Sequence, residues 1–524
     1  MKLNTIKLHS CGSPVSGQTQ ITLDDDYNVP DYRPDIVKII KEHGTLQFDE
    51  VKVTSGAAFI KGCLQFAVLY RSDQENGKIS CLKGEIPFQE KINCNGLTDY
   101  DLVQPSGEVE DLTIGVIHPR KISVRAVLFL KASVWKEKEE ELCTGFESDT
   151  QCEQRYRQIP VLQLLYRKND VCRQKSEFVL PSSKPNVQEI LWKSLELRNV
   201  DTRIEQEKLR VTGEVLAAVL YQEEDETDRI QWYETVLPLE CSVDCYGKDA
   251  ENLIYKIRTK PSSMELEVKP DYDGEERMFV MELAINLEIR VWQEQKVEVL
   301  EDVYSLQKEL LPERKNVMLG HILVKNDCQC RMTEQMELSG IPEKVLQICA
   351  CEGKVHVEKK ELTAQGLYAE GVLCVELLYV TTDDKMPVGS RKAIYPFEQL
   401  IEIMDAENKR DKIMTELECE IGQMSAVMLD QEHVEIKAVL NLKLLAFEME
   451  QIENITEIKE ELPDLEQLKK QPGLTGYIVK NGDSLWQIAK ENHTTVESIL
   501  KENQKTEDTL TRGEKLLIVK KISM

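Results

Sequence analysis

The sequence predicts a mainly β protein, in which three tandem β-rich, sandwich-like modules precede a small βααβ domain. Three observations predict this organisation. A strand-like segment with three anchor residues occurs three times, a second strand-like segment recurs near the end of each unit, and the C-terminal segment changes to short helical patterns. The length of 524 residues agrees with this division, because a domain averages about 150 residues.

The first repeated segment reads GCLQFAVLY, GEVLAAVLY and GVLCVELLY. Each copy has a glycine eight residues before its final tyrosine and a proline seventeen residues after that tyrosine. Successive tyrosines are 151 and 158 residues apart, so the copies recur at a nearly constant interval. The anchors are Gly62, Tyr70 and Pro87, then Gly213, Tyr221 and Pro238, and finally Gly371, Tyr379 and Pro396.

The second repeated segment ends at Trp135, Trp292 and Phe447. Both segments alternate apolar and polar residues, which is the pattern of a half-buried strand. Charged stretches such as SDQENGK and QEEDETDR are expected at turns, and acidic runs such as Asp24–Asp26 and the glutamates within 137–141 are expected in solvated loops. We therefore place the modules at residues 1–150, 151–310 and 311–462.

The repeated unit resembles the SPOCS domain, a family found in sporulation-associated proteins of endospore-forming bacteria. The resemblance rests on the glycine-to-tyrosine strand, the proline strand and the terminal alternating strand, and it covers nearly all of residues 1–460. The family has no known catalytic residues, so the resemblance implies no active site in the modules.

The C-terminal segment differs from the modules in charge and in pattern. Residues 470–524 carry a net charge of +2, whereas the rest of the chain carries −29. A polar linker is expected at residues 463–475, followed by a separate domain at residues 476–520. The sequence therefore attaches a near-neutral domain to a strongly acidic body.

Within this domain the pattern predicts a strand, two helices and a closing strand. The first strand is expected at Tyr477–Val479 and the last at residues 516–519. Ser484 with Gln487, and Thr494 with Glu497, have the spacing of a capping box, which predicts where the two helices begin. The segment resembles the LysM domain through the following residues: Tyr477, Val479, Gly482, Asp483, Ser484, Leu485, Trp486, Ile488, Ala489, Ile499, Leu500, Asn503, Leu510, Gly513, Leu516 and Ile518.

The resemblance implies a shallow groove that binds N-acetylglucosamine polymers, lined by the loop 482–486 and the loop 503–510. Leu485, Ile488 and Ile499 are expected in the core, and Gly482 is expected to serve turn geometry. The candidate partner- or glycan-binding residues are Asp483, Ser484, Trp486, Asn503, Gln504, Lys505, Thr509 and Leu510.

Composition restricts the partners. With 93 acidic against 66 basic residues, the net charge is −27, which disfavours nucleic acid and anionic membrane surfaces. No uncharged apolar stretch of 18 residues is present, so no membrane span is expected. The start MKLNTIKLHS lacks the apolar run of a secretory signal, so a cytosolic location is expected.

The sequence also offers little for catalysis. It contains no G-x4-G-K-[ST], G-x-S-x-G or H-E-x-x-H motif, and no cofactor is expected. The 15 cysteines are scattered and are expected to be mostly reduced, buried thiols. The pairs Cys328/Cys330 and Cys349/Cys351 raise the alternative of a zinc site, but C-x-C is not the usual ligand spacing, so no metal is expected.

Together the two resemblances imply a non-enzymatic spore-coat protein. Tandem SPOCS modules followed by one LysM domain are similar to the SipL-type spore morphogenetic proteins, which act in the mother cell at the forespore surface. That similarity implies that LysM contacts the ATPase of the coat basement layer and that the SPOCS modules bind other coat proteins. The alternatives are a peptidoglycan or cortex glycan binder and, further behind, a wall hydrolase.

Overall fold

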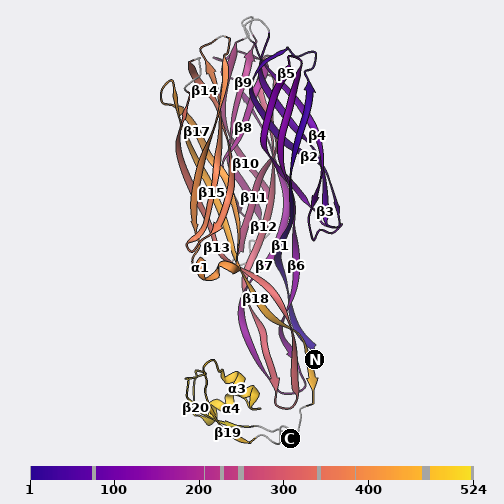
Figure 1. The fold of residues 1–524 in the computed structure, drawn as a ribbon, viewed down its shortest axis with the longest axis vertical. Coiled ribbons are helices and arrows are strands. Elements are labelled where there is room, and N and C mark those ends of the chain that lie inside the picture. The colour runs from indigo at the N-terminus through magenta and orange to yellow at the C-terminus, as the bar shows by residue number, and fades with distance from the viewer. Residues whose placement is uncertain are drawn as a thin grey trace.

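The computed structural model describes residues 2–73, 78–205, 207–224, 229–245, 253–338, 344–383, 385–462 and 472–520. The molecule is elongated. A wide head of packed sheets narrows to a shaft, and a small helical domain lies beside the free end of the shaft (Figure 1).

The three modules share one topology of two three-stranded antiparallel sheets. In module 1 the order β2-β3-β4 forms the short sheet and β1-β6-β5 forms the long sheet. Modules 2 and 3 repeat this arrangement as β8-β9-β10 with β7-β12-β11, and as β14-β15-β16 with β13-β18-β17. The predicted mainly β fold of three sandwich-like modules is confirmed.

The strands have the following bounds. Module 1 contains β1 (Lys2–Asn28), β2 (Ile36–Thr54), β3 (Ala57–Ser72), β4 (Ile79–Asn93), β5 (Gln104–His118) and β6 (Lys121–Glu147). Module 2 contains β7 (Cys152–Val179), β8 (Val187–Glu205), β9 (Lys208–Glu223), β10 (Ile230–Asp244), β11 (Leu253–Pro270) and β12 (Glu276–Ser305). Module 3 contains β13 (Glu309–Glu337), β14 (Val345–Leu362), β15 (Gly366–Thr381), β16 (Val388–Glu402), α1 (Ala406–Lys409), η2 (Arg410–Lys412), β17 (Ile413–Met428) and β18 (His433–Glu461).

The repeated anchor residues have structural roles. The hydroxyls of Tyr70 and Tyr221 donate to the carbonyls of Pro34 (3.1 Å) and Pro185 (3.3 Å), which ties the chain crossing from the long sheet to the short sheet. A Cβ atom at Gly62 would lie 2.2 Å from the carbonyl oxygen of Gln47, so only glycine fits there. The anchor prolines lie on the edge strands β4, β10 and β16, where a missing N–H is tolerated.

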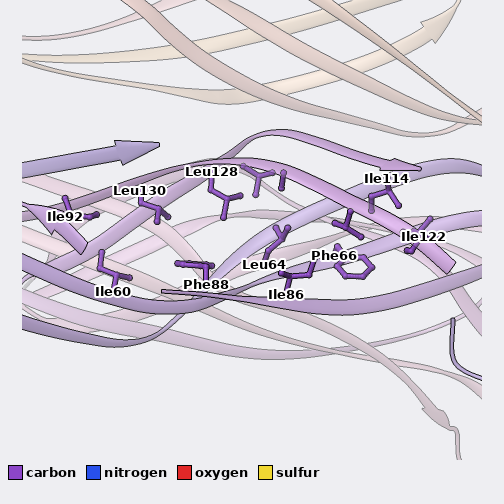
Figure 2. Packing of buried hydrophobic residues seen from close by; sticks show 14 of the residues in the cluster. Ile60, Leu64, Phe66, Ile86, Phe88, Ile92, Ile114, Ile122, Leu128 and Leu130 are labelled. Carbon is purple, nitrogen blue, oxygen red and sulfur yellow. The ribbon is translucent and has the colours of Figure 1, made fainter. Parts of the chain in front are cut away.

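Each sandwich has an apolar core of its own. In module 1, buried residues of the short sheet pack against buried residues of the long sheet. Figure 2 shows Leu64, Phe66 and Phe88 of the short sheet together with Leu128 and Leu130 of the long sheet. Equivalent clusters fill modules 2 and 3. In the head, each sandwich core therefore consists of residues from a single module.

The three short sheets meet on a pseudo-threefold axis. One buried cluster joins Leu69, Leu220 and Leu378, which occupy equivalent positions in β3, β9 and β15. Ion pairs link neighbouring modules around the ring: Arg33 to Glu189 (2.6 Å), Arg258 to Glu418 (2.7 Å) and Lys392 to Glu42 (2.6 Å). Because module 3 contacts module 1 again, the three modules form a closed ring.

A buried charge lies beside this axis. Lys41 of module 1 is 1% exposed and pairs with Glu352 (2.9 Å) and Glu376 (2.6 Å) of module 3. Its ammonium also lies 5.4 Å from the ring of Trp192 of module 2. Burial raises the pKa of Glu376, and the Lys41 charge opposes that rise. One side chain thus contacts all three modules at the centre of the head.

The shaft is built differently. The first halves of β1, β7 and β13 pair with the last halves of β6, β12 and β18, and the three ribbons pack on one another. Equivalent apolar side chains from all three ribbons fill the interior as the triads Leu8–Ile159–Val317, Cys143–Leu300–Ile455 and Phe146–Val303–Ile458. No single ribbon can bury these residues alone, so the shaft core is shared by the three modules.

The C-terminal domain has the expected βααβ order. Its elements are β19 (Leu474–Ile478), α3 (Leu485–Glu491), α4 (Val496–Glu502) and β20 (Lys515–Val519). The Ser484 hydroxyl accepts a hydrogen bond from the Gln487 N–H, which confirms the first helix cap. The second cap is Thr495, which accepts from the Ser498 N–H, so the expectation of Thr494 was wrong by one residue.

The placement of the acidic runs requires correction. Asp24–Asp26 and the glutamates within 137–141 lie in the strands β1 and β6 and not in loops. They fit a strand because charged residues there pair across it, as Lys7 does with Glu139 (2.9 Å). The cysteines agree with the expectation of mostly reduced thiols, because Cys172 and Cys241 form a disulfide between the two sheets of module 2 and the other cysteines whose side chains are described remain thiols.

Three predicted segments fall partly outside the described residues. These parts are residues 74–77 of the tip SDQENGK, residues 225–228 of the tip QEEDETDR and residues 463–471 of the predicted linker 463–475. Leu474 and Thr475, which we assigned to the linker, already belong to β19.

Candidate docking site

The first candidate loop of the C-terminal domain is held by Asp483. Its carboxylate accepts hydrogen bonds from the Tyr477 hydroxyl (2.9 Å) and the Lys480 N–H (2.7 Å). The backbone hydrogen bond from Lys480 contributes most to holding the pKa of Asp483 below its ordinary value. Asp483 and the cap residue Ser484 therefore shape the entry to α3, and their polar atoms are already engaged within the domain.

The second candidate loop is braced in a similar way. The Asn503 amide donates to the carbonyls of Ile499 and Leu517 (2.8 Å each), and its oxygen accepts from the Leu517 N–H (2.7 Å). The Lys505 ammonium donates to the carbonyl of Thr509 and pairs with Glu514. These bonds tie the loop 503–510 to β20.

Two of the three remaining candidates in this loop present their side chains outward. Gln504 and Thr509 are exposed, and Leu510 is half-buried against the apolar core of the domain. Gln504 has φ of 53°, a left-handed conformation that turns the chain after α4. An exposed amide and an exposed hydroxyl can each donate and accept hydrogen bonds, which suits a polar protein surface or a sugar.

Trp486 differs from the other candidates because it contacts the shaft. Its indole N–H donates to the Asp302 carboxylate (2.8 Å), and its ring packs edge-on against Tyr304 with centroids 4.9 Å apart. The Arg155 guanidinium lies 5.5 Å from the same ring. The Tyr304 hydroxyl donates to the Thr494 carbonyl (3.0 Å).

Asp302 is the electrostatic centre of this contact. It accepts hydrogen bonds from the Lys490 ammonium (2.8 and 2.9 Å) and from Arg314 (2.9 Å), and its side chain is 12% exposed. Burial alone would raise its pKa, but the hydrogen bonds from Lys490 and Trp486 outweigh burial and lower the pKa. The carboxylate is therefore held charged between two cations.

The sequence interpretation missed both shaft residues, Asp302 and Tyr304. Comparison of the repeats contains the signal that could have found them. Gly145 and Glu457 occupy the position of Asp302 in the other modules, and Glu147 and Lys459 occupy that of Tyr304. Only module 2 combines an acid with an aromatic residue at this bulge.

Elsewhere the described surface has a polar hollow of about 390 Å³ between modules 2 and 3. It is lined by Asn199, Gln329, Arg331, Gly422, Gln423, Val439 and Asn441. Among the residues whose placement is described, no three His, Cys, Asp or Glu side chains gather as metal ligands. No helix in the described part of the chain has the length and apolar character to cross a bilayer.

Comparison with known proteins agrees with the repeats. The SipL SPOCS domain family matches residues 35–117, 186–269 and 344–429, and the LysM family matches residues 477–519. No curated protein and no solved structure matches this chain. SPOCS and LysM are non-catalytic binding domains, and SPOCS domains fit a spore-associated protein. The chain therefore consists of three SipL-type SPOCS domains in tandem and a C-terminal LysM domain.

Proposed function

We propose that the protein is a non-enzymatic adaptor of spore-coat assembly, which acts in the mother cell at the forespore surface. Its LysM domain docks onto the ATPase of the coat basement layer, and its SPOCS modules bind further coat proteins. The domain boundaries follow the three repeats, at residues 1–150, 151–310 and 311–462, with LysM at 476–520.

The observation that supports this proposal most is that the long body and the small LysM domain have separate cores. The head and shaft form one continuous body whose axis is filled by apolar side chains. LysM has its own core of Val479, Leu485, Ile488, Ala489, Ile499, Leu516 and Ile518, and it lies at the far end of the shaft (Figure 1). A long body with a small binding domain at its tip suits attachment to a lattice, because several modest contacts on one chain raise the effective concentration.

The candidate contact residues for the partner are the eight loop residues of LysM. Gln504 and Thr509 form the exposed part, whereas Asp483, Ser484, Asn503 and Lys505 hold the loops in shape. Trp486 and Leu510 supply the apolar part, and aromatic residues are common anchors at protein interfaces.

Co-sedimentation of the full chain with polymerised basement-layer ATPase tests the proposal. The Gln504→Ala/Thr509→Ala variant should bind at least about tenfold more weakly, because two exposed polar contacts are removed. Glu497→Ala is the matched control, since Glu497 is exposed on α4 outside both loops. Unchanged binding of the double variant would contradict docking through this loop.

A glycan ligand is the second candidate function. The exposed amide and hydroxyl of Gln504 and Thr509 could hydrogen-bond N-acetylglucosamine units. Parallel binding assays with purified peptidoglycan and chitin oligomers distinguish the glycan-binding function from the adaptor function. Retention on glycan without binding to the ATPase would replace the adaptor with a cortex-binding protein.

A further inference from the structure

We propose that the shaft carries a docking surface for the LysM domain of its own chain, and that this contact withholds Trp486 from an outside partner. The surface consists of Arg155, Asp302, Tyr304 and Arg314 and is called the shaft dock below. The proposal concerns regulation of the same LysM domain, and it rests on the proposed function for the identity of the outside partner.

The fit of the shaft dock to LysM is both apolar and charged. Tyr304 is 5% exposed and belongs to the same buried cluster as Leu485 and Ile488 of LysM. Burying an aromatic ring with its hydroxyl bonded to a carbonyl is the arrangement of a specific interface. The Asp302 carboxylate pairs with Lys490, one of the cations of a domain that is near neutral beside an acidic body.

The pseudo-threefold symmetry of the shaft shows that the acid and the aromatic residue of the shaft dock, Asp302 and Tyr304, are a special feature of module 2. All three ribbons have a bulge at this level, at Asn4/Thr5, Leu300/Asp302 and Glu313/Arg314. A bulge re-aims the side chains next to it. At the equivalent position, module 1 has Gly145 and module 3 has the exposed Glu457.

Docking and partner binding through Trp486 compete for the same atoms. The indole has one hydrogen-bond donor, and that donor is engaged by Asp302. One ring contact is with Tyr304 and another with Arg155. The loop with Gln504 remains exposed, so docked LysM presents its polar loop but not its aromatic anchor.

Because of this competition, the shaft dock lowers the apparent affinity of LysM for a partner that binds Trp486. A partner that needs Trp486 binds only the undocked fraction of the chain, so its apparent affinity falls by that fraction. Weakening the dock should therefore strengthen partner binding, which is the reverse of what loss of a binding residue does.

The first test measures docking with no partner present. Hydroxyl-radical footprinting with mass spectrometry reports the accessibility of individual side chains in the full chain. Asp302→Asn and Lys490→Gln should each raise the oxidation rate of Trp486 about fivefold or more. Glu457→Gln is the matched control from module 3 and should leave the rate unchanged. Lys490→Gln acts from the LysM side, so its effect does not depend on the folding of the shaft.

The second test measures affinity for the polymerised ATPase with the same variants. The two dock variants should bind about fivefold or more tightly than the unmodified chain, and the control should not. An unchanged Trp486 footprint in both dock variants would overturn the docking surface. A raised footprint with unchanged affinity would overturn the withholding of Trp486. If no form binds the ATPase, the proposed function fails, while the footprint still decides whether the dock exists.

Discussion

The head and the shaft join the same three modules by different means. In the head each sandwich has a separate core, and the modules meet through ion pairs and one shared apolar cluster. In the shaft no module has a core of its own, because the buried triads take one residue from each ribbon. The comparison shows that one copy of the repeat supplies a whole core in the head, whereas all three copies of the chain are needed to supply the core of the shaft.

The largest effect is expected at the centre of the head. Lys41→Met removes the buried cation that pairs with Glu352 and Glu376, and it leaves these half-buried carboxylates with longer contacts such as those to Trp192 Nε1 (3.4 Å) and Lys392 (3.9 Å). Breaking a buried ion pair in this way costs about 3–5 kcal/mol. Thermal unfolding should show a lower Tm for this variant.

The rescue for Lys41→Met is the triple variant with Glu352→Gln and Glu376→Gln, which removes the unpaired charges and should recover much of the loss. A single variant as stable as the unmodified chain would show that the polar junction does not hold the head together.

The next largest loss of stability is expected from substitution of two buried leucines of module 1, one in the shaft and one in the sandwich. Leu142→Ala in the shaft and Leu128→Ala in the sandwich should each cost about 2–5 kcal/mol, because both side chains are fully buried. Hydrogen exchange should distinguish them. Leu128→Ala should loosen module 1 alone, whereas Leu142→Ala should also raise exchange in the shaft halves of β12 and β18. Exchange confined to module 1 in both variants would contradict a shared shaft core.

A smaller effect is expected in LysM, which belongs to neither core. Asn503→Ala removes two hydrogen bonds that join the end of α4 to Leu517 of β20 and a third to Ile499 within α4, and it should cost about 1–3 kcal/mol of local stability. Limited proteolysis should then cut LysM faster while the head and shaft keep their resistance. The neighbouring Gln504→Ala, which removes an exposed side chain, serves as the control and should change little.

The smallest effect is a pH dependence between modules 3 and 1. The hydrogen bond to Glu108 raises the pKa of His356, and burial only partly opposes it. Because the pKa is raised on folding, the pair stabilises fully below about pH 6.5, and this contribution is lost as pH rises through the folded-state pKa. The pair is partly exposed, so the effect should stay under about 1 kcal/mol. Comparing Tm from pH 5 to 9 with that of His356→Gln measures it, and identical profiles would contradict the assignment.

The sequence predicted the modules and LysM because their signals are local. Alternation over the segment ending at Tyr70 specifies a strand, and Ser484 with Gln487 specifies a helix start, without reference to the rest of the chain. The closed ring and the shared shaft could not be predicted, since Leu8 lies between Lys7 and His9 and Leu142 follows three glutamates, so neither belongs to a clear apolar pattern. The buried cluster that contains both also includes Val297, Val317 and Ile452, which lie more than 150 residues further along the chain.

In the candidate site, too, the contacts between residues far apart in the sequence could not be predicted. Trp486 was identified because it matches a LysM pattern, but its contact with Asp302 joins residues 184 positions apart. The acid and the tyrosine carry no local motif. They become visible only when the three repeats are compared position by position, since two of the copies lack the pair.

The shared shaft core also sets when the protein can finish folding. Leu8 lies near the start of the chain and its buried neighbour Ile452 near the end of module 3, so the core cannot close until almost the whole chain has left the ribosome. At about 5–20 residues per second, Leu8 waits roughly 20 to 90 seconds until Ile452 is synthesised. Contacts of such high sequence separation form slowly. The nascent protein should therefore pass through a state with folded sandwiches and an open, aggregation-prone tail, in which chaperone demand is highest.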